Sequence, residues 1–376
     1  MSGRLRLGVD GRAFSSPAGG VRRYVWEIYG ALPGVAPDVD AVALGASPGD
    51  ALPPSVIPYP ARSFPTNLGW MAATIPLAAR RARLDVYHAP AYTAPLWGVH
   101  PQVATIHDVS YERKPEWNAY RNDRVRRYFY KRSALSADRI ITDSGFSREE
   151  ITAAYGIPAD RIAVVPLAAG DSFTPGRFAA PEAPASVTQP YALHVGDLHI
   201  RRNLMTALDA VLALRRLPGS QPRLSLVCAG IDRGVGAGLT ARALDARDPG
   251  ALVLTGVVSE AVLVNLYRGA AMLAYPSRYE GFGLPVLEAM RCGVPVVAAN
   301  CASIPELVAG AGVLLDPLDV PAWVDAIRRV LTDAATAARL RETGIDRAKL
   351  FSWRRTAADT LAILRECADR ASKARP

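Results

Sequence analysis

A repeated alternation of short apolar runs with longer amphipathic segments is the feature that most constrains the fold of this chain. The short runs have the length and the Val, Ile, Leu and Ala content of buried strands, whereas the segments between them carry apolar residues at helical spacing. Strands and helices that alternate in this way form parallel sheets covered by helices. The predicted strands are residues 5–9, 40–44, 85–89, 102–106, 139–142, 162–166, 191–195, 224–230, 252–256, 272–276, 294–299 and 312–316. The predicted helices include residues 21–32, 147–156, 203–216 and 259–270.

The alternation occurs in two series, which indicates two domains. A single hydrophobic core rarely grows beyond about 250–300 residues, and this chain has 376. Residues 173–190 are rich in Pro, Ala and Ser and lack periodicity, as is typical of a linker. We therefore predict an α/β protein with an N-terminal domain over residues 1–172 and a C-terminal domain over residues 191–351. Both would be doubly wound parallel-sheet domains facing across a cleft, with ligands outside the carboxyl ends of the strands.

The composition limits the classes of function that this chain can have. The formal net charge is +9, which suits an anionic substrate or surface, although a soluble basic protein is the alternative. The basic residues are dispersed and no nucleic-acid-binding motif occurs, which argues against a nucleic-acid binder. The four cysteines form no CxxC pair, so we expect reduced thiols in a cytoplasmic protein. We also expect no signal peptide and no membrane span, because the apolar runs are too short.

A glycine turn followed by a helix is predicted in YPSRYEGFGLPVLEAM, residues 275–290. An apolar strand runs into the turn. Pro285 suits the first turn of the following helix, because proline has no N–H group to leave unsatisfied there. The backbone N–H groups of Gly283, Leu284 and Val286 would then be free at a helix N-terminus, which is an anion site and most often a phosphate site.

Two carboxylates flank this turn. Glu280 lies in the turn, and Glu288 follows about one helical turn into the helix. A carboxylate beside a phosphate is unfavourable unless it binds another part of the ligand, so sugar and ribose hydroxyls are the expected partners. Two solvated acids around a tight turn are the alternative.

Arg201 and Arg202 open a helix after another strand and glycine turn, in HVGDLHIRRNL. Cations oppose the dipole at a helix N-terminus, which is tolerable where an anion lies between them. Two guanidinium groups could hold a diphosphate and stabilise it as it leaves. A surface arginine pair is the alternative.

Weaker motifs lie elsewhere in the chain. His107 and Asp108 follow a predicted strand, so they are expected at its carboxyl end. Gly20 precedes a predicted helix and could approach a phosphate. Residues 234–238, GVGAG, lack the full dinucleotide-binding spacing and are interpreted as a loop. Residues 38–40 spell the DxD of metal-dependent transferases but are interpreted as a loop entering a strand.

Two local features complete the pattern. Ser147 and Glu150 fit a capping box at the start of the predicted helix 147–156. Residues 121–132, RNDRVRRYFYKR, concentrate basic side chains on a predicted helix. We predict peripheral docking of that helix to an anionic membrane, with a solvated helix face as the alternative.

Taken together, these motifs resemble the family-4 retaining glycosyltransferases, which have the GT-B fold. Residues 275–317 are similar to the family's donor site, and Glu280 and Glu288 match its E-x7-E signature. Further similarities are VGDLHIRRNL, VVPLAAGDSF, GGVRRY, TIHDVS, TDSGFSREEI and FSWRRTA. The resemblance covers nearly the whole chain. It implies two Rossmann-like domains, the first of which is completed by a C-terminal helix over about residues 352–370.

The resemblance also implies roles for the matched residues. The catalytic candidates are His107 and Glu280, which would lie beside the transferred sugar. The donor-binding candidates are Gly20, Arg201, Arg202, Phe282, Gly283, Leu284 and Glu288. Within that set, the two arginines would bind the diphosphate and Glu288 the ribose hydroxyls. Arg202 departs from the lysine usual in the family, and Asp197 stands where a small neutral residue is commoner. An acid at that position would weaken diphosphate binding unless it points away or pairs with Arg201.

The implied reaction moves a hexose from a nucleotide-diphosphate sugar to a glycan, lipid-linked or small-molecule acceptor, with retained configuration. We expect no metal and no cofactor, since arginines and a helix N-terminus would stabilise the leaving diphosphate. GDP-mannose is the first expected donor. A nucleotide-sugar epimerase and a non-catalytic nucleotide-sugar-binding protein are the alternatives. A pyridoxal-dependent phosphorylase would need a Schiff-base lysine, and no lysine lies in an apolar strand–turn context of the second domain.

Overall fold

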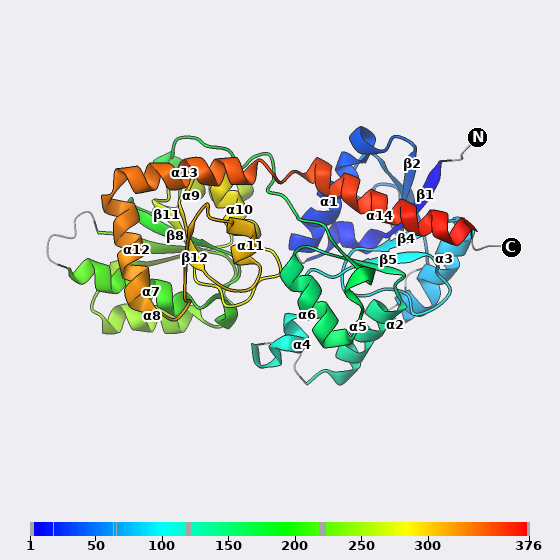
Figure 1. Cartoon of the computed structure of the whole chain (residues 1–376), viewed down its shortest axis with the longest axis horizontal. Coiled ribbons are helices and arrows are strands. Elements are labelled where there is room, and N and C mark those ends of the chain that lie inside the picture. The colour runs from blue at the N-terminus through cyan, green and yellow to red at the C-terminus, as the bar shows by residue number, and fades with distance from the viewer. Residues whose placement is uncertain are drawn as a thin grey trace. The chain divides into compact units, whose positions relative to one another are not determined.

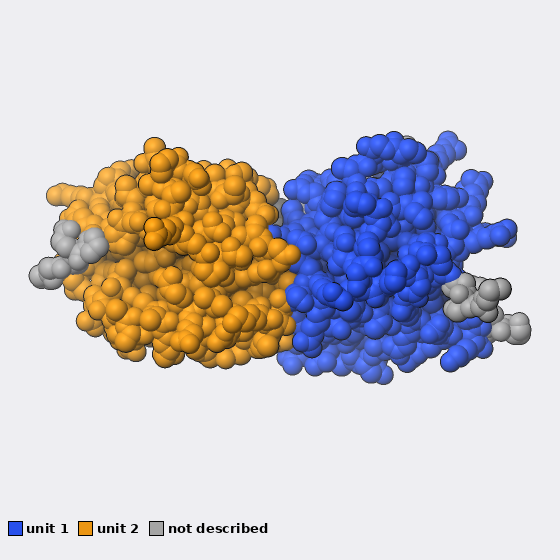
Figure 2. Space-filling model, turned by 90° about the horizontal axis from the view of Figure 1, so that it is seen from above, with its two compact units in different colours: residues 1–167, 352–376 blue, residues 168–351 orange. Residues whose placement is uncertain are grey.

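The chain forms two compact units, each with its own parallel sheet. The computed structural model describes residues 4–17, 19–62, 64, 66–117, 122–217 and 223–373. The first unit comprises residues 1–167 and 352–376, and the second comprises residues 168–351 (Figure 2). Each unit is a doubly wound α/β domain of the Rossmann type, so the predicted fold class is confirmed.

The first unit is built on a sheet of seven parallel strands within its described residues, in the order β3-β2-β1-β4-β5-β6-β7 (Figure 1). The strand order reverses between β1 and β4, which is where doubly wound sheets bind their ligands. The strands are β1 (Leu5–Asp10), β2 (Val39–Leu44), β3 (Val56–Tyr59), β4 (Val86–Ala89), β5 (Gln102–Thr105), β6 (Arg139–Thr142) and β7 (Ile162–Val164). The helices are η1 (Gly11–Ser15), α1 (Gly19–Val35), α2 (Asn67–Gly69), η2 (Trp70–Thr74), α3 (Ile75–Arg81), α4 (Ser110–Arg113), η3 (Pro115–Trp117), α5 (Arg124–Ser136), α6 (Gly145–Tyr155), η4 (Ala159–Arg161) and α14 (Trp353–Lys373).

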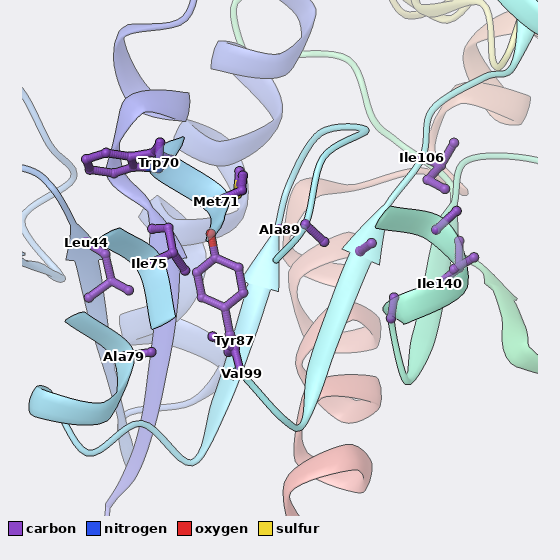
Figure 3. Close-up of a cluster of buried hydrophobic side chains, with 14 of the residues drawn as sticks. Leu44, Trp70, Met71, Ile75, Ala79, Tyr87, Ala89, Val99, Ile106 and Ile140 are labelled. Carbon is purple, nitrogen blue, oxygen red and sulfur yellow. The ribbon is translucent and has the colours of Figure 1, made fainter. Parts of the chain in front are cut away.

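Apolar faces on both sides of this sheet form the core of the first unit. Figure 3 shows Tyr87 of β4 among Met71, Ile75 and Val99, all of them nearly inaccessible to solvent. The last helix, α14, belongs to this unit although it follows the whole second unit in sequence. It lies beside α1 (Figure 1), and its Arg365 pairs with Asp38 at 2.5 Å.

The second unit has a sheet of six parallel strands within its described residues, in the order β10-β9-β8-β11-β12-β13 (Figure 1). This order reverses between β8 and β11. The strands are β8 (Tyr191–Val195), β9 (Ser225–Ala229), β10 (Leu252–Gly256), β11 (Met272–Tyr275), β12 (Val296–Ala299) and β13 (Val313–Leu315). The helices are η5 (Ala180–Glu182), η6 (Ile200–Arg202), α7 (Leu204–Arg216), α8 (Gly236–Asp245), η7 (Pro249–Ala251), α9 (Glu260–Gly269), α10 (Leu284–Arg291), α11 (Ile304–Val308), α12 (Val320–Thr332) and α13 (Ala334–Ala348).

Residues 173–190, the expected linker, belong to the second unit and are bound along α9. The backbone of Ala179 exchanges two hydrogen bonds of 2.8 Å with the side-chain amide of Asn265. The amide of Gln189 donates to the carbonyl of Gly269 at 2.8 Å. These contacts give a segment without strands or long helices a fixed course over the domain.

The structure corrects two local predictions. Helix α6 begins at Gly145, so its cap is Ser144, whose hydroxyl accepts the N–H of Ser147 at 3.0 Å. Ser147 is therefore a buried helical residue and not the predicted cap. Residues 234–238 are not simply a loop, because helix α8 starts within them. The carboxylate of Asp232 accepts three backbone N–H groups at that helix start, which holds it in place.

Within the described parts of the chain, no helix is long and apolar enough to cross a membrane.

Candidate functional site

A polar cluster lies at the point of the second unit where the strand order reverses. The carboxyl end of β8 continues through a glycine turn into η6, which carries Arg201 and Arg202. The neighbouring strand, β11, ends at Tyr275 and continues into the turn that carries Glu280. The two segments are joined directly, because the N–H of Arg278 donates to the carbonyl of Arg201 at 2.8 Å. The topology thus brings the predicted arginines and the predicted glutamate together.

Both arginines share the single carboxylate of Glu280. Arg202 donates to Glu280 Oε1 and to the hydroxyl of Tyr275, and its Nη1 lies 3.4 Å from Ser277 Oγ. Arg201 Nη1 lies 3.5 Å from Glu280 Oε2. Glu280 and Arg202 are both nearly buried, with side chains 7% and 10% exposed. Two guanidinium groups and one carboxylate give these three side chains a net charge of +1, which suits a further anionic group.

The walls behind this cluster are uncharged. The ring of His194 stacks on that of Tyr275, with ring centres 5.5 Å apart and planes inclined by 18°. Burial, with a smaller effect of the Arg202 charge, lowers the pKa of His194 to about 3, so the imidazole is neutral. The guanidinium carbon of Arg202 lies 5.4 Å from the Tyr275 ring centre, within the range of a cation–π contact.

The glycine turn before α10 has the predicted shape. Gly283 has φ of 105°, at which other residues are strained, and a Cβ atom there would also lie 2.7 Å from Ile304 Cδ1. The single O–H group of Ser303 fixes the turn, because it is shared between the carbonyls of Glu280 at 3.0 Å and Phe282 at 2.9 Å. Phe282 itself is buried.

The N-terminus of α10 has fewer free N–H groups than expected. Pro285 lies in its first turn, as predicted. The N–H of Val286, however, donates to the carbonyl of Gly283 at 2.9 Å and is not available to a ligand. The tight first turn of α10 already occupies the N–H group of Val286. The N–H groups of Gly283 and Leu284 make no hydrogen bond with the described residues and remain as donors for an anion.

Glu288 has a different environment from Glu280. It is buried in α10, and the hydroxyl of Tyr267 on α9 donates to its Oε2 at 2.9 Å. Burial first, and then the Glu288 charge, raise the pKa of Tyr267 well above its ordinary value, so this hydroxyl stays a neutral donor. A neutral donor holds Glu288 in position, whereas two cations hold Glu280.

His107 lies in the first unit, separated from the end of β5 by one residue, and is paired with a carboxylate that the sequence motifs did not single out. Its Nδ1 lies 2.8 Å from Asp143 Oδ2, and the two side chains are 15% and 3% exposed. Tyr24 of α1 meets the imidazole edge-on, with ring centres 4.9 Å apart. Burial lowers the pKa of His107, but the charge and hydrogen bond of Asp143, with Asp108, raise it above its ordinary value of 6.5. His107 is thus an oriented imidazole biased toward its protonated form.

The same sequence signal would have found Asp143. It directly follows β6, just as His107 follows β5, and these neighbouring parallel strands end at the same edge of the sheet.

Gly20 lies in the first turn of α1 in the first unit. It is exposed, and a Cβ atom added there would have no described atom within 4 Å. Packing within the described residues therefore does not require glycine at this position.

The acidic departure Asp197 and the acids of the DxD sequence have partners away from the arginine cluster. Asp197 pairs with Arg233 at 3.0 Å and not with Arg201. In the DxD sequence, Asp40 pairs with Arg4 at 2.7 Å and Asp38 with Arg365 of α14. Within the described ranges, no group of three or more His, Cys, Asp or Glu side chains is arranged to hold a metal ion.

The basic stretch 121–132 falls mostly on α5, although Arg121 lies outside the described residues. Arg126 and Arg127 are paired with carboxylates, whereas Arg124, Lys131 and Arg132 are exposed. The exposed side chains are the ones that could meet an anionic surface.

Comparison with known protein families matches both halves of the chain. The family model described as glycosyl transferases group 1 matches residues 178–347, and that described as Glycosyltransferase Family 4 matches residues 18–169. Apart from residues 168–169, the two matches each fall in one structural unit, and together they contain all the candidate site residues.

Individual relatives agree with these matches. The chain is 36% identical over 284 residues to the O-antigen chain mannosyltransferase B of Escherichia coli, covering 73% of each protein. It is 34% identical over 242 residues to the D-inositol 3-phosphate glycosyltransferase of Saccharomonospora viridis, covering 61% of this chain and 56% of the relative. Among solved structures, sucrose-phosphate synthase from Thermosynechococcus elongatus matches with a TM-score of 0.75 and 21% identity, covering 96% of this chain and 99% of that one. These fold matches confirm the GT-B fold class.

Proposed function

Because this chain belongs to the glycosyltransferases, as its group 1 and family 4 matches show, we propose that it transfers mannose from GDP-mannose to a glycan or lipid-linked acceptor, with retained configuration. The transfer of a sugar from a nucleotide-sugar donor to a glycan acceptor follows from the family. The choice of mannose is supported by the 36% identity to a protein named as a mannosyltransferase.

The main support for a donor site in the second unit is the pairing of Arg201 and Arg202 with one carboxylate, at the point where the strand order reverses. In the proposal these guanidinium groups hold the diphosphate and stabilise its charge as the bond to the sugar breaks. The N–H groups of Gly283 and Leu284 assist at the start of α10. No metal or cofactor is needed for this step.

The remaining candidates bind the rest of the donor. Glu280, with Phe282 beside it in the turn, contacts the transferred sugar, and Glu288 binds the ribose hydroxyls. In the first unit, His107 acts beside the sugar at the reacting centre, oriented by Asp143 through its Nδ1 atom. Gly20 allows close approach of the phosphate. This role would explain why glycine stands at a position where packing within the described residues does not require it.

A panel of nucleotide sugars in a thermal-shift assay tests the proposal. A donor at a hundredfold excess over its dissociation constant stabilises the chain by about 2.7 kcal/mol, and we expect GDP-mannose to give the largest shift. Arg202→Met should abolish the shift. Arg339→Met removes an exposed cation of the same unit and serves as the matched control.

Product analysis then separates the alternatives. Retained configuration at the transferred sugar, read by NMR of the product, supports the proposal. Conversion of the donor sugar to its epimer without acceptor would identify a nucleotide-sugar epimerase. Binding without any turnover, for every acceptor class offered, would identify a non-catalytic nucleotide-sugar-binding protein.

A further inference from the structure

A small cavity in the first unit lies next to the His107 segment and has no role in the donor site. Its volume is about 210 Å³, and three tyrosines, two arginines and one carboxylate line most of its wall. These residues are Tyr92, Tyr111, Tyr130, Arg126, Arg127 and Asp108. Drug-sized ligands occupy cavities of about 300–1,000 Å³, so this one is of a size for a single ring.

The aromatic wall is a connected cluster. Tyr130 of α5 stacks on Tyr92, with ring centres 5.8 Å apart and planes inclined by 27°. Tyr111 meets the Tyr130 ring edge-on at 5.0 Å and is held by a hydrogen bond of 2.6 Å between its hydroxyl and that of Tyr155. The Tyr92 ring also lies edge-on to His107 at 6.3 Å, which connects the cavity to the proposed reacting centre.

The backbone at Tyr92 is strained. Its φ of 46° is in the left-handed region, which a bulky residue rarely adopts. Such strain persists where the surrounding structure imposes it, and it is concentrated at ligand-binding positions. Here it sets the Tyr92 ring against Tyr130 and His107.

The charges at the cavity are already compensated. Arg127 makes a bidentate pair with Glu112, through Nε at 3.1 Å and Nη2 at 2.5 Å. Arg126 Nε lies 3.2 Å from Asp123 Oδ2. Because each arginine of the lining has its own carboxylate and Asp108 adds a further negative charge, a phosphate or carboxylate ligand would meet no uncompensated cation among these groups.

We propose that this cavity is a pyranose subsite that holds a neutral sugar ring of the acceptor glycan beside His107. The tyrosine faces would contact the apolar C–H surface of the ring, and Asp108 with the two arginines would bind its hydroxyls. This subsite rests on the proposed function, because it serves the acceptor of that transfer.

Saturation-transfer NMR on the full chain tests the subsite, with methyl α-D-mannopyranoside as probe and the acyclic alcohol mannitol as comparison. We expect the pyranoside and not mannitol to give a signal. Tyr130→Leu should weaken pyranoside binding about three- to tenfold, the range expected for the loss of one aromatic contact. Tyr128→Leu replaces a tyrosine of the same helix that is 65% exposed and outside the cavity, and it should leave binding unchanged.

A second variant tests the charge argument without disturbing the aromatic wall. Asp123 caps α5 by accepting the N–H of Arg126, and asparagine caps helices equally well. Asp123→Asn should therefore keep the helix but remove the charge that compensates the Arg126 guanidinium. Mannose 6-phosphate should bind this variant more tightly than the wild type, while pyranoside binding stays the same.

Several outcomes would overturn the subsite. Equal pyranoside signals for Tyr130→Leu and wild type would place the sugar elsewhere. Tighter binding of mannose 6-phosphate than of the pyranoside by the wild type, if Tyr130→Leu weakens it, would reject a neutral ligand. A failure of the proposed function is distinguishable, since it would remove the thermal shift with nucleotide sugars and leave the NMR result intact.

Discussion

The polar centres of the two units are built on the same topology, and each has a buried neutral histidine behind it, but their charged groups differ. In the second unit, Arg201, Arg202 and Glu280 form a charged cluster. In the first unit, a chain of neutral groups lies behind His107: the Tyr24 hydroxyl and His88 Nε2 both hydrogen-bond to the Thr105 hydroxyl, at 2.9 and 2.8 Å. Burial lowers the pKa of His88 to about 3, so this imidazole is neutral.

The difference teaches how each centre fits its proposed partner. A charged cluster stabilises an anion such as a diphosphate, but its own groups are costly to bury unless they are paired. In the first unit a single carboxylate, Asp143, orients the His107 ring. The neutral network behind that ring costs less to bury, which suits a group that must present a single nitrogen to a reacting sugar. The sharpest tests therefore change the charge in each centre and compare the consequences.

The largest effect should come from the two glutamates. Glu280→Gln leaves the nearly buried Arg202 without its carboxylate, so we expect a loss of about 3 kcal/mol of stability. It should also lower kcat about 10- to 150-fold, because a hydrogen bond to a charged group contributes about 1.5–3 kcal/mol. Glu288→Gln keeps an acceptor for the neutral Tyr267 hydroxyl, so it should cost about 1 kcal/mol and mainly raise the donor KM.

Steady-state kinetics with thermal unfolding of both variants checks this contrast. Interactions that strengthen in the transition state alter kcat, whereas uniform binding alters KM. If both variants lose stability equally and neither changes kcat or KM more than a fewfold, the two glutamates do not contact the donor.

A smaller effect is expected in the first unit, from Asp143→Asn. His107 and Asp143 both have raised pKa values in the folded chain. For His107 the resulting stabilisation is complete below its ordinary pKa of 6.5 and is lost as pH rises through the raised value. The raised pKa of Asp143 likewise makes the free energy of unfolding fall as pH rises, but at lower pH. The free energy of unfolding of the wild type should thus fall as pH rises above about 6.5, by at most about 1.4 kcal/mol for each pH unit. The variant should show a flatter profile.

Histidine NMR resolves the same change at one residue. His88 and His194, with pKa values of about 3, should not titrate between about pH 5 and 9. The His107 signals, identified by their absence in His107→Gln, should titrate above 6.5 in the wild type and lower in Asp143→Asn. A titration of His107 that is the same in both proteins would show that Asp143 does not set its protonation.

The fold was predictable because buried parallel strands appear in a sequence as continuous apolar runs. Every predicted strand coincides with an observed one. The missed strand, β3, is at the sheet edge, is only partly buried and contains Pro58. Prolines are confined to such edges, and a short half-exposed run has no strong apolar signal.

The composition of the cluster of Arg201, Arg202 and Glu280 was predictable, but its internal pairing was not. The sequence motifs identified Arg202 and Glu280 as candidate site residues, although they lie 78 residues apart. Their ion pair depends on the adjacency of β8 and β11, which the order of strands in the sequence does not specify. The loss of the Val286 N–H as a donor likewise depends on how tightly the first turn of α10 closes.

The smallest expected effect concerns the exposed basic side chains of α5. We propose that Arg124, Lys131 and Arg132 contact an anionic membrane, because they are exposed whereas Arg126 and Arg127 are paired with carboxylates. A Lys or Arg near such a surface contributes about 1 kcal/mol, so Lys131→Gln or Arg132→Gln should each weaken sedimentation with anionic vesicles about fivefold.

The control is Arg339→Gln, which removes an exposed cation of the second unit. Because the attraction is electrostatic, binding should also weaken with added salt. Equal sedimentation of all three variants and the wild type at low salt would show that the exposed basic residues of α5 form a solvated helix face. Only the paired residues Arg126 and Arg127, which line the sugar cavity, would then keep a proposed role.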